Sequence, residues 1–310
     1  MRRYTDENMF VILGELRETL RSIEPGATLS FEVCHPDLRG NGAEGRLLRL
    51  EPEGRMARVR SLRLLGDLAE LLGCRLMMPA ARDNAWVVLT LQKLDPSAET
   101  IEPIDPVEKY GIGSPFSAIE KQEEPYFLHG FLRALDWVRL EERDALLDLG
   151  VNHGDELRLI KRLRGESFDR MQVTGIDHCP SAIAVASERF EDTNVVCHCH
   201  DINRLDALCL SPCDLLISIG TLHSPGIDGN RILMEVVQRL LKPSSGVVLG
   251  FPNCRYVDGE VVFGAKMKNF AESELSLVLK DLYFAKRYLQ QHQFKVTIFG
   301  KQELFLCAIR

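Results

Sequence analysis

The chain has 310 residues, of which 45% are hydrophobic and 27% charged, and its formal net charge is −7. This length favours two domains over one, and the composition excludes a disordered or low-complexity chain. The acidic balance disfavours a generic nucleic-acid-binding protein, which usually carries a basic excess.

The cysteines and the N-terminus indicate the compartment. Nine cysteines, an odd number, do not make a disulfide framework in a chain of this length. Arg2 and Arg3 are typical of a signal peptide, but Asp6 and Glu7 follow at once and the next apolar stretch is too short. No apolar run approaches the roughly 20 residues that span a bilayer. We therefore expect a reduced, soluble, cytoplasmic protein.

The first 95 residues are predicted to form a small α+β domain, whose role the sequence does not indicate. Apolar spacing predicts helices over 6–23 and 62–72 and strands over 27–34, 75–78 and 85–91. Between them, residues 46–63 contain six arginines, which are Arg46, Arg49, Arg55, Arg58, Arg60 and Arg63. This stretch is either a solvated face or a strip that holds the phosphates of an RNA.

Residues 96–144 are predicted to be a linker followed by a helical lid. Asp95 to Pro115 is rich in Pro, Glu, Gly and Ser, whereas 119–140 has helical apolar spacing. Tyr110, Tyr126 and Phe127 either cover a ligand from this lid or only pack against the fold.

From residue 145 onward, strand-like and helix-like segments alternate. Alternation of this kind predicts a doubly wound α/β domain over 145–310, with a mostly parallel sheet covered on both faces. Only Gly300 to Glu303 joins the last two strands, so these form an antiparallel hairpin. The predicted strands are 145–149, 173–176, 195–199, 214–217, 247–251, 295–299 and 304–309, and the predicted helices are 155–164, 181–191, 203–209, 230–241 and 272–292.

Three strand ends carry residues that suit an adenosine-containing ligand. The first strand leads through Asp148 to a turn with Gly150, Asn152 and Gly154, where glycine lets the backbone approach a ligand. Asp177 ends the second strand, where a carboxylate can accept hydrogen bonds from ribose hydroxyls. Asp201 ends the third strand and can accept from an adenine amino group.

These motifs together resemble class I S-adenosylmethionine-dependent methyltransferases. Leu146 to Gly154 is similar to the family's glycine motif, Asp177 to its ribose contact and Asp201 to its adenine-side acid. The run from Cys213 to His223 is similar to the fourth strand and its loop, and the run from Arg239 to Leu249 to the turn into strand five. The resemblance implies a seven-stranded sheet and S-adenosylmethionine as cofactor. It assigns cofactor contacts to Asp148, Gly150, Asn152, Gly154, Asp177, Asp201, Ile202 and Ser218.

Two departures from the family pattern involve three residues. Asn152 stands where the motif has glycine, and Ser244 and Ser245 replace the usual glycines before strand five. Asparagine tolerates left-handed backbone better than other residues, so Asn152 can keep the turn. It can also crowd the methionine end of the cofactor, and both outcomes remain open.

His223 is the candidate catalytic residue because it lies in the loop that faces the methyl acceptor in this family. A histidine there can deprotonate or orient an acceptor group, or it can serve packing alone. Cys197, His198, Cys199 and His200 do not predict a metal site, because alternate side chains of a strand point to opposite faces. Tyr283, Phe284, Arg287, Tyr288 and His292 either line an acceptor pocket or form an aromatic part of the core.

The sequence therefore predicts a methyltransferase whose acceptor is a small molecule. An RNA or protein acceptor recruited by the N-terminal domain is one alternative. A non-catalytic module that binds S-adenosylmethionine is the other, and Asn152 motivates it. The sequence predicts no membrane partner and does not indicate the oligomeric state.

Overall fold

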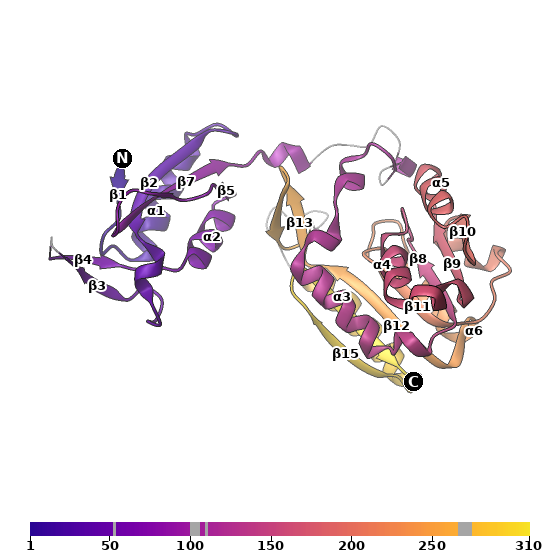
Figure 1. The fold of residues 1–310 in the computed structure, drawn as a ribbon. Helices are drawn as coiled ribbons and strands as arrows, with labels where there is room; N and C mark the ends of the chain where they lie inside the picture. The colour runs from indigo at the N-terminus through magenta and orange to yellow at the C-terminus, as the bar shows by residue number, and fades with distance from the viewer. Residues whose placement is uncertain (52–53, 100–105, 109–110, 266–274) are drawn as a thin grey trace. The chain divides into compact units, whose positions relative to one another are not determined.

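A computed structural model describes residues 1–51, 54–99, 106–108, 111–265 and 275–310 (Figure 1). The chain divides into two units. Unit 1 contains residues 1–100 and 256–262, and unit 2 contains residues 101–255 and 263–310.

Unit 1 is a small sheet with two helices. Its strands follow the order β1-β2-β7-β5, with β6 also paired to β7. Apolar residues at helical spacing in α1 and α2 (Ile12, Leu16 and Leu20, then Leu65 and Leu68) pack on the strands. The bounds are β1 Arg2–Arg3, α1 Met9–Arg21, β2 Thr28–Cys34, α2 Leu62–Leu71, β5 Cys74–Leu76, β6 Ala80–Ala81 and β7 Trp86–Lys93.

The arginine-rich stretch of unit 1 forms a β-hairpin that the sequence did not predict. Its strands are β3 (Leu47–Leu50) and β4 (Arg55–Arg58). Two of its arginines bind backbone carbonyl groups. Arg58 donates to Gly45 O at 2.6 Å, and Arg60, which is 4% exposed, donates to Glu7 O at 2.5 Å. These two therefore serve the fold of unit 1.

A second unpredicted hairpin, β13 (Cys254–Val257) and β14 (Glu260–Phe263), brings the chain back into unit 1. Val257 and Val262 pack with Leu94. Arg75 donates to Glu260 Oε1 at 2.5 Å and to Asp258 O at 2.7 Å. Unit 1 thus consists of two separate stretches of the sequence.

Unit 2 contains a seven-stranded sheet in the order β10-β9-β8-β11-β12-β16-β15. The pairs from β10 to β12 are parallel, whereas β16 runs antiparallel to both β12 and β15. This confirms the predicted doubly wound, mostly parallel sheet with a C-terminal antiparallel hairpin. The bounds are β8 Ala145–Leu149, β9 Gln172–Asp177, β10 Val195–Cys199, β11 Cys213–Ile219, β12 Leu241–Pro252, β15 Lys295–Gly300 and β16 Glu303–Ile309.

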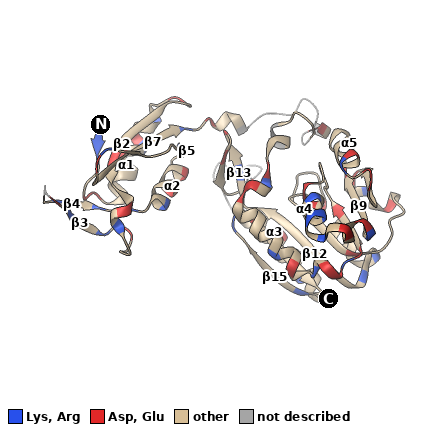
Figure 2. Cartoon of the chain, viewed as in Figure 1, with Lys and Arg blue, Asp and Glu red and all other residues tan. Residues whose placement is uncertain are grey.

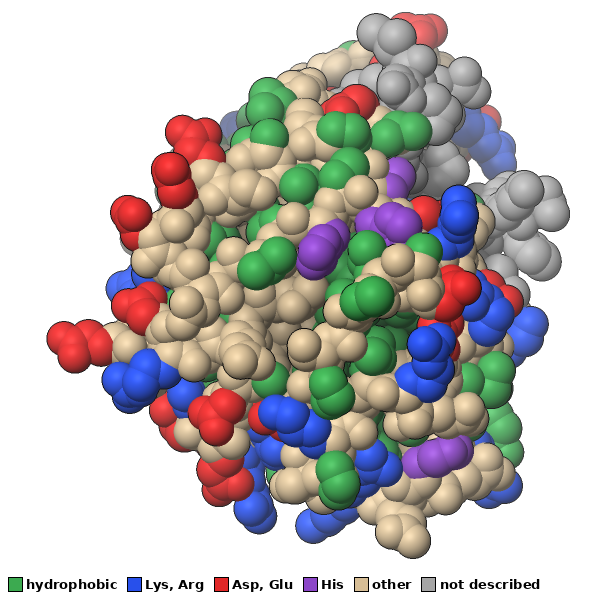
Figure 3. Space-filling view, turned by 90° about the vertical axis from the view of Figure 1, so that its right-hand side faces the viewer, with side chains coloured by type: hydrophobic (Ala, Val, Ile, Leu, Met, Phe, Trp, Pro, Cys, Tyr) green, Lys and Arg blue, Asp and Glu red, His purple; other side chains and the backbone are tan. Residues whose placement is uncertain are grey.

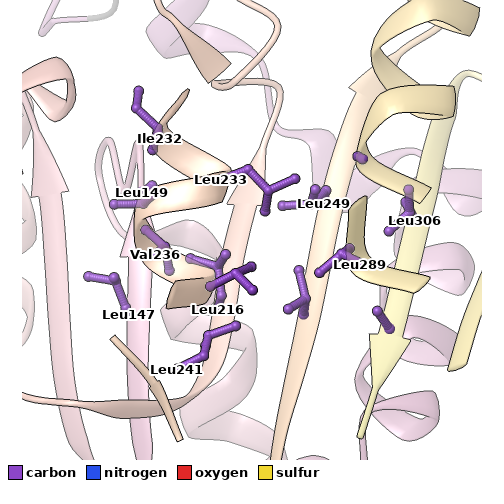
Figure 4. Close-up of a cluster of buried hydrophobic side chains, with 14 of the residues drawn as sticks. Leu147, Leu149, Leu216, Ile232, Leu233, Val236, Leu241, Leu249, Leu289 and Leu306 are labelled. Carbon is purple, nitrogen blue, oxygen red and sulfur yellow. The ribbon is translucent and has the colours of Figure 1, made fainter. Parts of the chain in front are cut away.

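Helices cover both faces of this sheet. On one face, α6 and α7 pack through residues such as Leu233 and Leu289 against Leu147, Leu216 and Leu249 (Figure 4). On the other face, α3, α4 and α5 pack against the alternate strand residues, such as Leu146 and Leu215. Adjacent residues of one strand serve opposite cores, because strand side chains alternate. The bounds are α3 Pro125–Trp137, α4 Asp155–Arg164, α5 Pro180–Arg189, α6 Gly229–Arg239 and α7 Ser276–Gln291.

Some predicted bounds in unit 2 were wrong. The segment expected to be a helix at 203–209 is a short 3-10 helix, Ile202–Ala207, with non-helical backbone at Arg204. Strand β12 begins at Leu241 rather than Val247, and its register with β11 shifts between Cys213 and Leu215. Parts of two predicted segments lie outside the described residues. They are linker residues 100–105, 109 and Tyr110, and residues 272–274 of the last predicted helix.

None of the helices in the described residues combines the length and apolar character that crossing a bilayer requires. In the described residues, no three His, Cys, Asp or Glu side chains gather as a metal site.

Charged side chains of both signs are interspersed along α4 and α5 (Figure 2).

Candidate functional site at the carboxyl edge of the sheet

Strand order reverses at β8, which has β9 on one side and β11 on the other. The chain leaves β8 toward β9 and β10 and then returns to β11. In open α/β sheets, ligands bind beyond the carboxyl ends of the strands at such a reversal. The predicted residues after β8, β9, β10 and β11 therefore come to one edge.

The turn after β8 has left-handed backbone at three alternate positions. The φ angles are 83° at Gly150, 46° at Asn152 and 77° at Gly154. Asparagine thus keeps the conformation that glycine gives elsewhere in this motif. A Cβ on Gly150 would overlap Thr221 Oγ1, and one on Gly154 would lie 2.6 Å from the Phe190 ring. Packing inside unit 2 is therefore sufficient to require glycine at 150 and 154.

Asp177 is tied to this turn. The Asn152 N–H donates to Asp177 Oδ2 at 3.1 Å, and the Cys179 N–H donates to Oδ1 at 3.0 Å. Nδ1 of His178 lies 3.4 Å from Asp177 Oδ1. Each carboxylate oxygen can accept a further hydrogen bond, so the two can receive a pair of ribose hydroxyls.

Asp148 and Ser218 lie deeper at the same edge. Asp148 is 2% exposed, and its Oδ2 is a buried oxygen with no hydrogen-bond partner in the described part of the chain. Burial, followed by the charges of Glu156 and Asp177, raises the pKa of Asp148. The Ser218 hydroxyl donates to Leu149 O at 2.9 Å and so fixes the end of β8 beside β11.

Asp201 and Ile202 follow the edge strand β10. Cys199 of β10 pairs with Asp177 of β9, so Asp201 lies just beyond Asp177 along the carboxyl edge of the sheet. Asp201 is exposed, and its Oδ1 accepts from Asn203 N at 2.8 Å. Ile202 is 5% exposed and belongs to the core on the α6 side.

His223 is hydrogen-bonded to a carboxylate that the sequence did not predict. Its Nδ1 lies 2.5 Å from Asp281 Oδ2, and the His223 side chain is 15% exposed. The Phe251 ring meets the imidazole edge-on, with 6.4 Å between the ring centroids. A carboxylate on Nδ1 fixes the tautomer that carries a proton there and leaves Nε2 as a hydrogen-bond acceptor.

His223 and Asp281 line a cavity of about 160 Å³. Its wall comes from the loop after β11, the start of α6, the end of β12 and helix α7. The other lining residues are Leu222, Ile227, Asp228, Gly229, Asn230, Leu233, Leu249, Phe251 and Ala285. None of the α7 aromatic candidates is among them. Phe284 and Tyr288 instead stack on each other and belong to the core on that face.

The segment before β8 contributes two further contacts. Lys121 Nζ donates to Glu303 Oε2 at 3.1 Å, and Gln122 Nε2 donates to Asp155 O at 2.6 Å. Phe127 is buried against Phe131 and Phe305, so its role is packing. Tyr126 is 56% exposed.

Asp281, Glu303 and Lys121 were missed because sequence spacing gives no sign of them. Asp281 is a single acid in an amphipathic helix, and it meets His223 across 58 residues. Glu303 was predicted to lie in the link before the last strand, and Lys121 lies 182 residues away from it. Only the folded sheet brings these groups to one edge.

Residues 146–244 match the family model of a methyltransferase domain. No curated protein matches the chain. The similar solved structures include the plantazolicin methyltransferase BpumL, with 13% identity, a TM-score of 0.44, and coverage of 66% of this chain and 93% of that one. Another is a SAM dependent methyltransferase from Aquifex aeolicus, with 16% identity, a TM-score of 0.39, and coverage of 70% and 99%. A third is the N-methyltransferase NodS from Bradyrhizobium japonicum, with 14% identity, a TM-score of 0.43, and coverage of 70% and 98%.

The family match covers the segment from β8 through the start of β12, which contains the glycine turn, Asp177, Asp201 and the loop with His223. The sheet has seven strands, as the resemblance implied, and its last strand runs antiparallel, as the short link before it predicted. Residues 146–244 thus match a methyltransferase domain, and the sheet of the unit that contains them is that of the class I S-adenosylmethionine-dependent methyltransferase fold.

Proposed function

We propose that the chain transfers the methyl group of S-adenosylmethionine to a small-molecule acceptor, with His223 as the general base. The observation that carries this proposal is the His223–Asp281 pair, which lines a cavity beside the loop after β11. When bound, S-adenosylmethionine supplies an electrophilic methyl group on a sulfonium.

The residues after β8, β9 and β10 fit this donor. Asp177 would receive the ribose hydroxyls, and Asp201 with Ile202 would hold the adenine. Gly150, Asn152 and Gly154 would border the methionine portion, and Ser218 would hold the strand end beside it. Asp148 Oδ2 and Asn152 Oδ1 are buried acceptors without partners in the described residues, as expected where an ammonium group binds.

His223 would act on the acceptor. Asp281 holds the Nδ1 side of the imidazole, so Nε2 can take a proton from an acceptor hydroxyl, amine or thiol. Asp281 also stabilises the imidazolium that results. Alignment of acceptor and methyl group supplies much of the remaining rate enhancement.

Two features favour a small acceptor over RNA. A cavity of about 160 Å³ holds one ring-sized group. On the face of unit 2 seen in Figure 3, basic side chains are interspersed with acidic ones, unlike the continuous basic surface of a typical RNA-binding protein.

The acceptor class can be tested with S-adenosylmethionine carrying a tritiated methyl group. The protein is incubated with a low-molecular-weight filtrate, an RNA fraction and a protein fraction of cell extract. We expect label in the filtrate. Label confined to RNA or protein would overturn the small-molecule acceptor. Donor binding without label in any fraction would favour the non-catalytic module.

The roles of His223 and Asp281 are tested by measuring turnover with the acceptor that the tritium label identifies. We expect His223→Gln to lower turnover by about 10²-fold or more, and Asp281→Asn to lower it as well, with donor affinity measured by calorimetry unchanged. Asp136→Asn removes an exposed carboxylate of α3 and is the matched control. Wild-type turnover in His223→Gln would show that His223 is not the base.

The proposal also covers the N-terminal residues and the cellular location of the chain. We assign residues 1–95 no chemistry of their own and keep 96–144 as linker and lid segment. The described residues include all nine cysteines and no disulfide joins any of them, which supports a reducing, cytoplasmic location.

A further inference from the structure

A line of carboxylates runs along the carboxyl edge of the sheet in unit 2. It consists of Asp177 at the end of β9, Asp148 in β8, Glu156 in the first turn of α4 and Glu303 at the start of β16. Asp148 interacts electrostatically with Asp177 and with Glu156, and Glu156 interacts with Glu303. We call these four residues the carboxylate line.

Two members have buried oxygens that lack a partner. Asp148 is 2% exposed and Glu303 is 4% exposed. Among the described residues, neither Asp148 Oδ2 nor Glu303 Oε1 has a hydrogen-bond partner. A buried, unpartnered carboxylate oxygen is costly, so such an atom marks a place where a donor or a cation binds.

Lys121 is the cation of this cluster. Its Nζ contacts Glu303 Oε2 at 3.1 Å and interacts with Glu156. Asp155 and Glu124 add negative charge beside Glu156 and Glu303, while His178 and His223 face Asp177 and Glu303. Among the named groups, the carboxyl groups outnumber the basic side chains. Burial raises the pKa of Glu156 to about 7 and raises the pKa values of Asp148 and Glu303.

The carboxylate line ends at the loop that holds His223. A Cβ on Gly250 would lie 2.8 Å from Glu303 Oε1, so this oxygen lies over the end of β12. The Gly250 carbonyl in turn accepts from the Gly220 N–H at 2.9 Å, and His223 follows three residues later. The line therefore extends from the ribose-side carboxylate to the loop beside the reacting methyl.

We propose that the carboxylate line binds the positive charges of S-adenosylmethionine, its sulfonium and its ammonium, and so makes the site prefer the donor over the demethylated product. This inference rests on the proposed function. Methyl transfer turns the sulfonium into a neutral thioether and moves the positive charge to the acceptor, from which His223 removes a proton. The attraction between the carboxylates and the nucleoside falls at that moment, which favours release of S-adenosylhomocysteine.

The competing role for Lys121 and Glu303 is purely structural, because their ion pair holds the segment before α3 against β16. Opposite charge changes separate the two roles. Glu303→Gln removes a negative charge and Lys121→Gln removes a positive one. If the ion pair is only structural, each variant should weaken S-adenosylmethionine and S-adenosylhomocysteine alike. If the charges set the preference, Glu303→Gln should lower the donor-to-product affinity ratio and Lys121→Gln should raise it.

The test is isothermal titration calorimetry of the full chain. The ligands are S-adenosylmethionine, S-adenosylhomocysteine and sinefungin, in which an amine-bearing carbon replaces the methylated sulfur. We expect Glu303→Gln to weaken the two cationic ligands by about tenfold and the neutral product by less than about twofold. Lys121→Gln should raise the donor-to-product ratio. Glu141→Gln, an exposed carboxylate on the amino side of β8, should change neither affinity.

Proton release on ligand binding gives a second readout. Glu156 is partly protonated near pH 7, and a cation beside it favours the ionised form, so donor binding should release protons. Titrations in buffers of different ionisation enthalpy measure this release. We expect it for S-adenosylmethionine, little of it for S-adenosylhomocysteine, and its loss in Glu156→Gln.

The outcomes distinguish this inference from the proposed function. Wild-type protein that binds neither ligand would overturn both. Binding of donor and product with equal affinity and equal proton release would overturn the carboxylate line and leave the methyltransferase proposal intact. Equal weakening of donor and product by Glu303→Gln would assign Glu303 to structure alone.

Discussion

The turn after β8 shows how single residues satisfy several demands at once. Gly150, Asn152 and Gly154 all have positive φ, yet Asn152 accommodates it with a side chain. Gly150 and Gly154 cannot, because Thr221 and Phe190 occupy the space that a Cβ would need. The sequence attributed all three positions to the cofactor, whereas packing explains two of them.

Gly150→Ala should destabilise unit 2 by about 1–3 kcal/mol, because it adds backbone strain and a clash with Thr221. Gly220→Ala is the matched control, since φ is 70° there but no atom lies within 4 Å of the added Cβ. Chemical denaturation measures both changes in unfolding free energy. If the two variants lost the same stability, the contact with Thr221 would contribute nothing.

At the scale of elements, backbone conformation decides what a glycine contributes. Gly14 lies inside α1, where a Cβ meets no atom within 4 Å. Gly26 lies in the turn before β2, where the space is equally open but φ is 81°. Steric room is therefore the same at both positions, and only the backbone angle differs.

Gly14→Ala should stabilise unit 1 by about 0.5–1 kcal/mol, because alanine loses less entropy than glycine in a helix. Gly26→Ala should destabilise it, because left-handed backbone is unfavourable for alanine. Thermal unfolding of the two variants should therefore shift in opposite directions from the wild type. Shifts of the same sign would contradict the assigned backbone at one of the two glycines.

At the scale of the whole molecule, stability depends on charges that are far apart in the sequence. Burial, with Asp155 and Glu303 nearby, raises the pKa of Glu156 from 4.5 to about 7, although Lys121 opposes this. The folded state then binds this proton more tightly than the unfolded state. Between about pH 4.5 and 7, the contribution of Glu156 to the unfolding free energy falls as the pH rises.

Glu156→Gln removes this titration. Relative to the wild type, the variant should therefore gain stability as the pH is raised from 5 to 8, and denaturant unfolding at several pH values measures the difference. The exposed Glu141→Gln should show a constant difference over the same range. A constant difference for Glu156→Gln as well would place Glu156 in a water-like environment.

The sequence by itself determined the alternation of strands and helices in unit 2, because strand and helix periodicities differ and the turns carry glycine. Helix 155–164 and strands 145–149 and 195–199 have the bounds that the sequence predicted. It also placed Asp177, Asp201 and the His223 loop at strand ends, because each lies at the end of a strand or shortly after it. The hairpins β3–β4 and β13–β14 were not predicted, since their strands have only four residues each.

Only the tertiary structure decided which charged groups meet. Asp281 reaches His223, Lys121 reaches Glu303, and residues 256–262 return to unit 1, all across long stretches of chain. Local periodicity reports which face of an element is buried but not which distant element covers that face. The position of Asp177 and Asp201 at the carboxyl edge of the sheet could therefore be predicted from strand ends, whereas the His223–Asp281 pair and the carboxylate line arise from packing between distant elements.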